Sequence, residues 1–107
     1  AWVGDDAVLY TLGEITIGAN SVVSQKCYLC TGSHDFMSPH FDITASPVVI
    51  GEKCWLATDV FVAPGVSVGD GTVVGARSSV FKSLPANKIC RGNPAVVIRE
   101  RVETEKL

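Results

Sequence analysis

Large aliphatic side chains recur at every sixth position over the second half of the chain. The series runs through Ile50, Leu56, Val62, Val68, Val74 and Val80. An amphipathic helix repeats every 3.6 residues and a half-buried strand every 2, so neither element explains a period of six. A fixed short period is instead typical of a solenoid, in which equivalent residues stack on one another.

The position after each of these aliphatic residues is usually small. It holds Gly51, Ala57, Ala63, Gly69, Gly75 and Phe81. The same register occurs upstream at Ile17, Val23 and Leu29, and an earlier stretch with Val3 and Leu9 lies two residues out of phase with Ile17. A unit of six residues with one large apolar side chain describes one flat side of a triangular coil, and small neighbours let the chain bend at the corners.

Three such sides make a turn of about 18 residues, with parallel strands of adjacent turns about 4.8 Å apart. The expected stacked pairs are Ile50 with Val68, Leu56 with Val74, and Val62 with Val80. The chain has 107 residues, of which 47% are hydrophobic, so it has material for about five turns around one narrow core. We therefore expect an all-β fold in a single domain, residues 1–107.

The two ends of the coil are expected to differ. Open ends expose unpaired strand edges, which natural proteins usually cover. Residues 98–107 are charged and rich in helix formers, and we expect them to form a short helix that caps the C-terminal end. No comparable segment precedes Val3, and the chain starts at Ala1, so we expect that an N-terminal part has been removed rather than that partner chains cover this end.

Charge is unevenly distributed along the chain. The net charge is −2, with an acidic excess before residue 77 and a basic excess after it. The later basic residues are Arg77, Lys82, Lys88, Arg91, Arg99, Arg101 and Lys106. A solvated end of mixed charge and a site for a small polyanion are both compatible with this pattern. We expect no nucleic-acid groove, because the chain is acidic overall and has no basic stripe with interleaved aromatic residues.

The four cysteines do not form a metal-binding pattern, and we expect no metal site. Cys27 and Cys30 are closely spaced, but no second pair follows and Cys90 stands alone. Cys27, Cys30 and Cys54 occupy compact or small places of their repeat units, and free cysteine is often buried. The sequence shows no signal peptide and no membrane-spanning run, so a reducing cytoplasm is the expected location.

The repeat is interrupted once, between Leu29 and Ile50, where the step exceeds a full turn by three residues. The interruption begins near Gly32, and we expect a loop insertion at about 35–47. His34 and His40, the only histidines of the chain, lie in this segment. Loops on a rigid scaffold often carry functional residues, and an imidazole can act as a general base near neutral pH. His34 is therefore a catalytic candidate, and an ordinary surface histidine is the alternative.

Several segments resemble a known enzyme family. Residues 28–35 read YLCTGSHD, which is similar to the active-site segment of the hexapeptide-repeat O-acetyltransferases. Residues 50–57 (IGEKCWLA), 64–69 (PGVSVG), 74–80 (VGARSSV) and 92–98 (GNPAVVI) match, in order, segments of the branch related to maltose, galactoside and colanic-acid acetyltransferases. The resemblance extends over nearly the whole chain. It implies a left-handed parallel β-helix, and the hand of the coil comes from the resemblance alone.

This resemblance also implies an activity. The family transfers acetyl groups from acetyl-CoA to a hydroxyl group, here of a sugar or polysaccharide, without an acyl-enzyme intermediate. His34 corresponds to the general base that takes the hydroxyl proton. The implied cofactor-binding residues are Trp55 near the active site, Thr58 and Ala76 at the pantetheine arm, and Arg77, Lys82 and Arg99 at the phosphates. The cofactor is expected in a groove between two subunits of a homotrimer.

The chain departs from the family pattern at two places, and other functions also remain open. Phe81 stands where related chains often carry threonine, and an asparagine common near Thr11 is missing. The alternatives are a non-catalytic trimeric scaffold or binding module, and a chloramphenicol-type acetyltransferase that acts on a xenobiotic. A β-helical carbonic anhydrase is not favoured, because its metal needs three histidine ligands and the chain contains two histidines.

Overall fold

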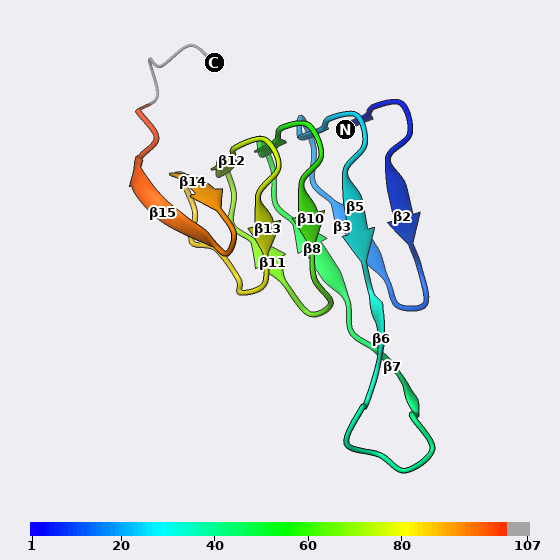
Figure 1. Ribbon diagram of the computed structural model, residues 1–107. Helices are drawn as coiled ribbons and strands as arrows, with labels where there is room; N and C mark the ends of the chain where they lie inside the picture. Colours follow the sequence, from blue (N-terminus) through cyan, green and yellow to red (C-terminus); the bar gives the residue numbers. More distant parts are fainter. Residues whose placement is uncertain (103–107) are drawn as a thin grey trace.

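Residues 1–102 are described by a computed structural model, and every regular element among them is a β-strand (Figure 1). The first sheet contains, in spatial order, β1 (Trp2–Val3), β4 (Val22–Val23), β9 (Trp55–Leu56), β12 (Val73–Val74), β14 (Lys88–Gly92) and β15 (Ala95–Glu100). The second contains β2 (Val8–Tyr10), β5 (Tyr28–Cys30), β10 (Phe61–Val62) and β13 (Ser79–Val80). The third contains β3 (Ile15–Ile17), β8 (Val48–Ile50) and β11 (Ser67–Val68).

Consecutive strands of the coil lie on successive sheets, and each pairs in parallel with the equivalent strand of a neighbouring turn. This arrangement is a parallel β-helix. The predicted pairs Ile50–Val68, Leu56–Val74 and Val62–Val80 are all present. The stretch that is out of phase in sequence joins the same columns, because Val3 pairs with Val23 and Leu9 with Leu29. The inward-facing aliphatic columns form the buried core.

Small residues are required where neighbouring turns approach most closely. A Cβ atom on Gly18 would lie 2.5 Å from the carbonyl carbon of Gly51, and one on Gly69 would lie 2.5 Å from the backbone nitrogen of Ala86. Both distances are far below a van der Waals contact, so a side chain at either position would push two neighbouring turns apart. At the same corner the buried hydroxyl of Ser21 donates to the Gly51 carbonyl at 2.6 Å, which ties two turns together.

The expectation of a C-terminal helix is wrong for the residues described. The first part of the segment 98–107 belongs to β15, which pairs antiparallel with β14 and covers the last turn. The β-branched run 96–98 favours a strand, and the open edge of β14 offers backbone partners that a helix could not use. Residues 103–107 lie outside the described part. Within residues 1–102 no helix is long and apolar enough to cross a membrane.

The interruption of the repeat is an insertion within one turn and not a lengthened turn. Leu29 pairs with Val62 in the second sheet, whereas Ile50 pairs with Ile17 in the third sheet. The extra residues therefore leave the coil at the edge between these two sheets. They form an antiparallel hairpin of β6 (Gly32–His34) and β7 (Ile43–Ala45), which projects away from the coil in Figure 1. The hairpin begins at Gly32, before the expected range of 35–47.

Candidate functional site

Thr31 anchors the base of the hairpin to the coil. Its backbone nitrogen donates to the Tyr10 carbonyl at 3.1 Å, and its hydroxyl donates to the same oxygen at 2.5 Å. The hydroxyl also accepts a bond from the Gly13 nitrogen at 2.8 Å, and the Thr31 carbonyl accepts one from the Ser46 nitrogen at 2.9 Å. Because both sides of the base are fixed, His34 leaves the coil from a defined position.

The tip of the hairpin is closed by its own hydrogen bonds. His34 pairs with Ile43 at the end of the ladder, and the Asp35 nitrogen donates to the Asp42 carbonyl at 2.8 Å. The carboxylate of Asp35 accepts a bond from the Met37 nitrogen at 3.0 Å. Asp35 therefore shapes the turn, and the group that orients His34 comes from another residue.

That group is the carbonyl of Phe41, on the opposite arm of the hairpin. His34 Nδ1 lies 3.0 Å from the Phe41 oxygen, and the two rings are 5.4 Å apart. A carbonyl can only accept, so Nδ1 carries the hydrogen and the neutral ring keeps its lone pair on Nε2. Phe41 has a left-handed backbone with φ of 54°, a conformation that also occurs at corners of the coil, for example at Lys53 and Arg77. His34 thus has one fixed tautomer with a nitrogen able to accept a proton.

His34 lines a pocket of about 390 Å³. Tyr10 and Tyr28 contribute to it from the second sheet, and Ser33 and Ile43 from the hairpin. Aromatic walls with a few hydroxyl groups suit an organic ligand that has both apolar and polar faces. Neither tyrosine was among the site residues expected from the sequence, although each is next to a leucine of an inward-facing column and so lies on the outside of the coil.

The six expected cofactor-binding residues are absent from the lining of this pocket, and three of them meet elsewhere. Thr58, Ala76 and Arg77 lie at the corner that leads from the first sheet to the second, where the Arg77 nitrogen donates to the Thr58 carbonyl at 2.9 Å. Arg77 Nε lies 4.0 Å from a carboxylate oxygen of Asp59, and both side chains are exposed. His34 is at the opposite edge of the second sheet.

The other three candidates are dispersed. Trp55 opens β9 in the first sheet, and its Nε1 donates to the Ser24 hydroxyl at 3.0 Å. Arg99 lies in β15, opposite Ile89 in the same sheet. Lys82 is exposed and follows β13, at the corner between the second and third sheets. The hairpin leaves the coil at this same corner, two turns earlier. Of the six expected cofactor-binding residues, only Lys82 lies at the same edge of the coil as His34 within one chain.

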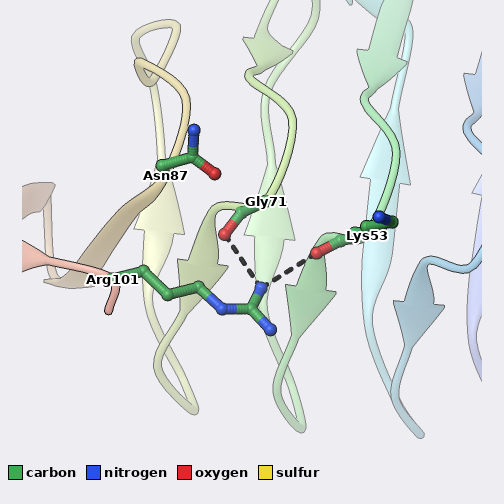
Figure 2. A pocket seen from close by; sticks show the side chains of 4 residues that line it. All are labelled: Lys53, Gly71, Asn87 and Arg101. Carbon is green, nitrogen blue, oxygen red and sulfur yellow. Dashed lines mark hydrogen bonds between the residues drawn. The ribbon is translucent and has the colours of Figure 1, made fainter. Parts of the chain in front are cut away.

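A second pocket, of about 410 Å³, lies at the corner between the third and first sheets and is lined by Lys53, Gly71, Asn87 and Arg101 (Figure 2). Arg101 Nη1 donates to the carbonyls of Lys53 and Gly71, each at 2.9 Å. The Arg101 backbone nitrogen donates to the Asn87 carbonyl at 2.9 Å. Arg101, which directly follows β15, thus binds the carbonyl groups of three successive turns. These bonds fasten the C-terminal strand to the coil.

Three of the four thiols are buried in the core of the coil. Burial raises the pKa of Cys27, Cys54 and Cys90 above the ordinary value of 9.0, which keeps these thiols neutral at physiological pH. Cys30 is half-buried and lines the same pocket as His34, and its Sγ donates to the Gly32 carbonyl at 3.1 Å. The buried thiols therefore serve as small packing groups and not as thiolates.

Comparison with known proteins identifies relatives of the coil. A family model for the bacterial transferase hexapeptide (six repeats) matches residues 47–82. WcaF of Escherichia coli strain K12, provisionally named a colanic acid biosynthesis acetyltransferase, is 85% identical over 105 residues, which are 98% of this chain and 58% of that protein.

Two solved structures have the same fold. A maltose O-acetyltransferase from Clostridium difficile 630 has a TM-score of 0.89 and 30% identity, over 95% of this chain and 57% of that one. A galactoside acetyltransferase in complex with coenzyme A has a TM-score of 0.85 and 28% identity, over 94% of this chain and 55% of that one. The chain therefore spans little more than half the length of each of these three relatives.

Proposed function

Because the chain belongs to the hexapeptide-repeat acetyltransferase family, we propose that it is an acetyl-CoA-dependent O-acetyltransferase, built on a left-handed coil, that acts on a hydroxyl group of a sugar or polysaccharide. The observation that carries this proposal is the bond between His34 Nδ1 and the Phe41 carbonyl, at the edge of a pocket with aromatic walls. It supports His34 as the general base.

The chemistry follows from the tautomer of His34. Nε2 of the neutral ring accepts the proton of the acceptor hydroxyl as the oxygen becomes a nucleophile. Nδ1 remains a donor throughout, so the bond to Phe41 stabilises the ring before and after it becomes positively charged. When bound, acetyl-CoA supplies the acetyl group. The ring returns to its neutral form when Nε2 gives the proton to the sulfur of coenzyme A, which would leave as the free thiol once its bond to the acetyl group is broken.

The basic C-terminal part of the chain fits an anionic cofactor. Lys82 and Arg99 carry charges suited to its phosphate groups, and Arg77 is a further candidate because its long, exposed ion pair with Asp59 leaves the guanidinium accessible. Thr58 and Ala76 lie at the same corner as Arg77 and would face the pantetheine arm. We assign Trp55 to the part of the cofactor nearest the reacting atoms.

Within a single chain, His34 and the corner with Thr58 and Arg77 lie at opposite edges of the second sheet. The corner with Thr58 and Arg77 precedes the strands of the second sheet, whereas the hairpin with His34 follows them. A groove between two chains would set the hairpin of one chain beside the corner of another. A homotrimer, with three such grooves, is therefore the proposed active form. The cytoplasmic location expected from the sequence stays a prediction.

Calorimetric titration of the chain with acetyl-CoA tests this function, with the molar mass measured in the same buffer. We expect saturable binding near one cofactor per chain of a trimer. Lys82→Ala and Arg99→Ala should weaken that binding and reduce its dependence on salt, because phosphate contacts are screened by ions. A folded trimer that does not bind acetyl-CoA would contradict the proposal and favour the non-catalytic scaffold.

A further inference from the structure

Thr31 places a buried hydroxyl group at the point where the hairpin leaves the coil. Its side chain is fully buried and bonds to two backbone groups of the preceding turn, the Tyr10 carbonyl and the Gly13 nitrogen. The equivalent positions of the two following turns hold Pro64 and Lys82, neither of which has a hydroxyl group. This corner of the coil therefore forms without the hydroxyl, which points to a role of Thr31 in the hairpin.

The direction of the hairpin has few other constraints. The strands β6 and β7 pair with each other, and no strand of the coil extends their ladder. Gly32 packs closely on the preceding turn, since an added Cβ would lie 2.5 Å from the Leu12 side chain and 2.6 Å from the Tyr10 ring. These contacts are with the ends of side chains, which can move. The hydroxyl of Thr31 instead binds backbone atoms that the coil holds in place, so the direction of the hairpin is set mainly at Thr31.

The position of His34 is sensitive to that direction. His34 is the third residue after Thr31, and three residues of an extended strand span about 10 Å, so a rotation of about 10° at Thr31 displaces His34 by about 2 Å. A displacement of about 1 Å can lower the rate of a reaction about a hundredfold. The bond from His34 Nδ1 to the Phe41 carbonyl lies within the hairpin and moves with it. That bond therefore fixes the tautomer of the ring, but not the place of the ring relative to the coil.

Thr31 also holds a residue of the pocket wall. The Tyr10 carbonyl accepts both the hydroxyl and the backbone N–H of Thr31, and Tyr10 lines the same pocket as His34. We infer that Thr31 is a positioning residue for the general base, because its hydroxyl sets the direction of the hairpin and so the place of His34 relative to the pocket wall. Thr31 is buried and acts only through His34. This inference rests on the proposed transferase function and adds a residue to its machinery.

The test compares two buried threonines that make similar bonds. Thr31→Val keeps the shape of the side chain and removes the hydroxyl. Thr72→Val does the same at the corner between the third and first sheets, where the fully buried Thr72 hydroxyl donates to the Pro85 carbonyl at 2.5 Å and accepts from the Lys88 nitrogen at 3.3 Å. Both variants should lower the melting temperature to a similar extent, since each leaves a backbone N–H without its partner. An effect of lost stability alone would therefore appear in both.

The first readout is the transfer of radiolabelled acetyl groups to glucose, galactose and their oligomers. We expect Thr31→Val to lose about tenfold or more in kcat, with the KM for acetyl-CoA unchanged, and Thr72→Val to stay within about twofold of the parent. Thr31→Ser retains the hydroxyl and should recover most of the lost rate. Equal losses of kcat in Thr31→Val and Thr72→Val would overturn the inference. So would a loss in Thr31→Ser as large as that in Thr31→Val.

The second readout, the direction of the hairpin, needs no turnover. Residual dipolar couplings of the amide groups of β6 and β7 report this direction relative to the strands of the coil. We expect them to change in Thr31→Val and not in Thr72→Val. If the parent transfers no acetyl group but the hairpin turns in Thr31→Val, Thr31 sets the direction of the hairpin and the transferase proposal fails. If the parent is active and Thr31→Val matches Thr72→Val in both readouts, the transferase stands and the positioning role is wrong. An unchanged hairpin in Thr31→Val overturns the inference whether or not the parent is active.

Discussion

Strands of the coil pair with equivalent strands in neighbouring turns, whereas the strands of the β6–β7 hairpin pair only with each other. The coil residues share one buried core, and the hairpin presents most of its side chains to solvent. This difference implies that stability resides in the coil and that the hairpin can be altered with little effect on folding. Activity and stability should therefore respond to different substitutions.

Truncation of an aliphatic side chain tests this difference most strongly. Leu56 is fully buried between Val23 and Val74, so Leu56→Ala should lower the free energy of unfolding by about 3 kcal/mol through lost burial and a new cavity. Ile43, in the hairpin, is 66% exposed, and Ile43→Ala should change it by less than about 0.5 kcal/mol. Denaturant unfolding measures both. Equal losses would show that the hairpin is part of the stabilising core.

A methyl group added at a corner of the coil should lower the free energy of unfolding somewhat less than Leu56→Ala does. Gly69→Ala places a methyl group against the Ala86 backbone, which cannot move without separating two turns, and a loss of about 2 kcal/mol is expected. At Gly75 the nearest atom to an added Cβ is the Cβ of Arg91, at 3.1 Å. Gly75→Ala should therefore be milder in the same unfolding measurement. If Gly69→Ala is neutral, close contact between turns does not explain the small residues.

The C-terminal strand offers a third comparison within the coil. Arg101→Ala removes the guanidinium that holds two carbonyls and should lower the free energy of unfolding by about 1 kcal/mol. Arg77→Ala breaks only a long, exposed ion pair and should leave thermal unfolding unchanged. A lower melting temperature in Arg77→Ala than in Arg101→Ala would contradict the fastening role of Arg101.

The buried thiols predict a smaller effect, confined to alkaline pH. Burial raises the folded-state pKa of Cys27, Cys54 and Cys90 above 9.0. Below the pKa of the unfolded chain both states are protonated, and the stabilising contribution is complete. As pH rises through that value toward the folded pKa, the unfolded chain releases protons first, so the free energy of unfolding falls. Cys54→Ala should make the free energy of unfolding fall less steeply between about pH 9 and 10. An equally steep fall in the variant would contradict a raised pKa of the Cys54 thiol.

The coil could be predicted from the sequence because its period is local and strict. Each stacked pair, such as Leu56 with Val74, follows from counting residues. The hairpin could not be predicted in the same way. Its path depends on Thr31, which binds the Tyr10 carbonyl of the preceding turn, and on the left-handed backbone of Phe41. Neither feature belongs to the six-residue repeat, so the spacing of residues could not predict it.

The candidate site shows the same division. His34 was identified from its segment, whereas the Phe41 carbonyl that fixes its tautomer depends on the hairpin pairing. The cofactor-binding candidates also followed from matched segments, and in the single chain none of them lines the pocket of His34. At the C-terminus, charge suggested a helix, but the open edge of β14 and the β-branched run 96–98 led to a strand.

The central claim is that His34 performs chemistry from a hairpin that the fold does not need. The most direct measurement is the rate of acetyl transfer by His34→Ala and His40→Ala, the two histidines of one segment, with unfolding followed for both. We expect His34→Ala to lose about a hundredfold or more in rate at unchanged stability, and His40→Ala to match the parent. Equal rates in both variants, or a loss of rate in His34→Ala that parallels a loss of stability, would contradict the account.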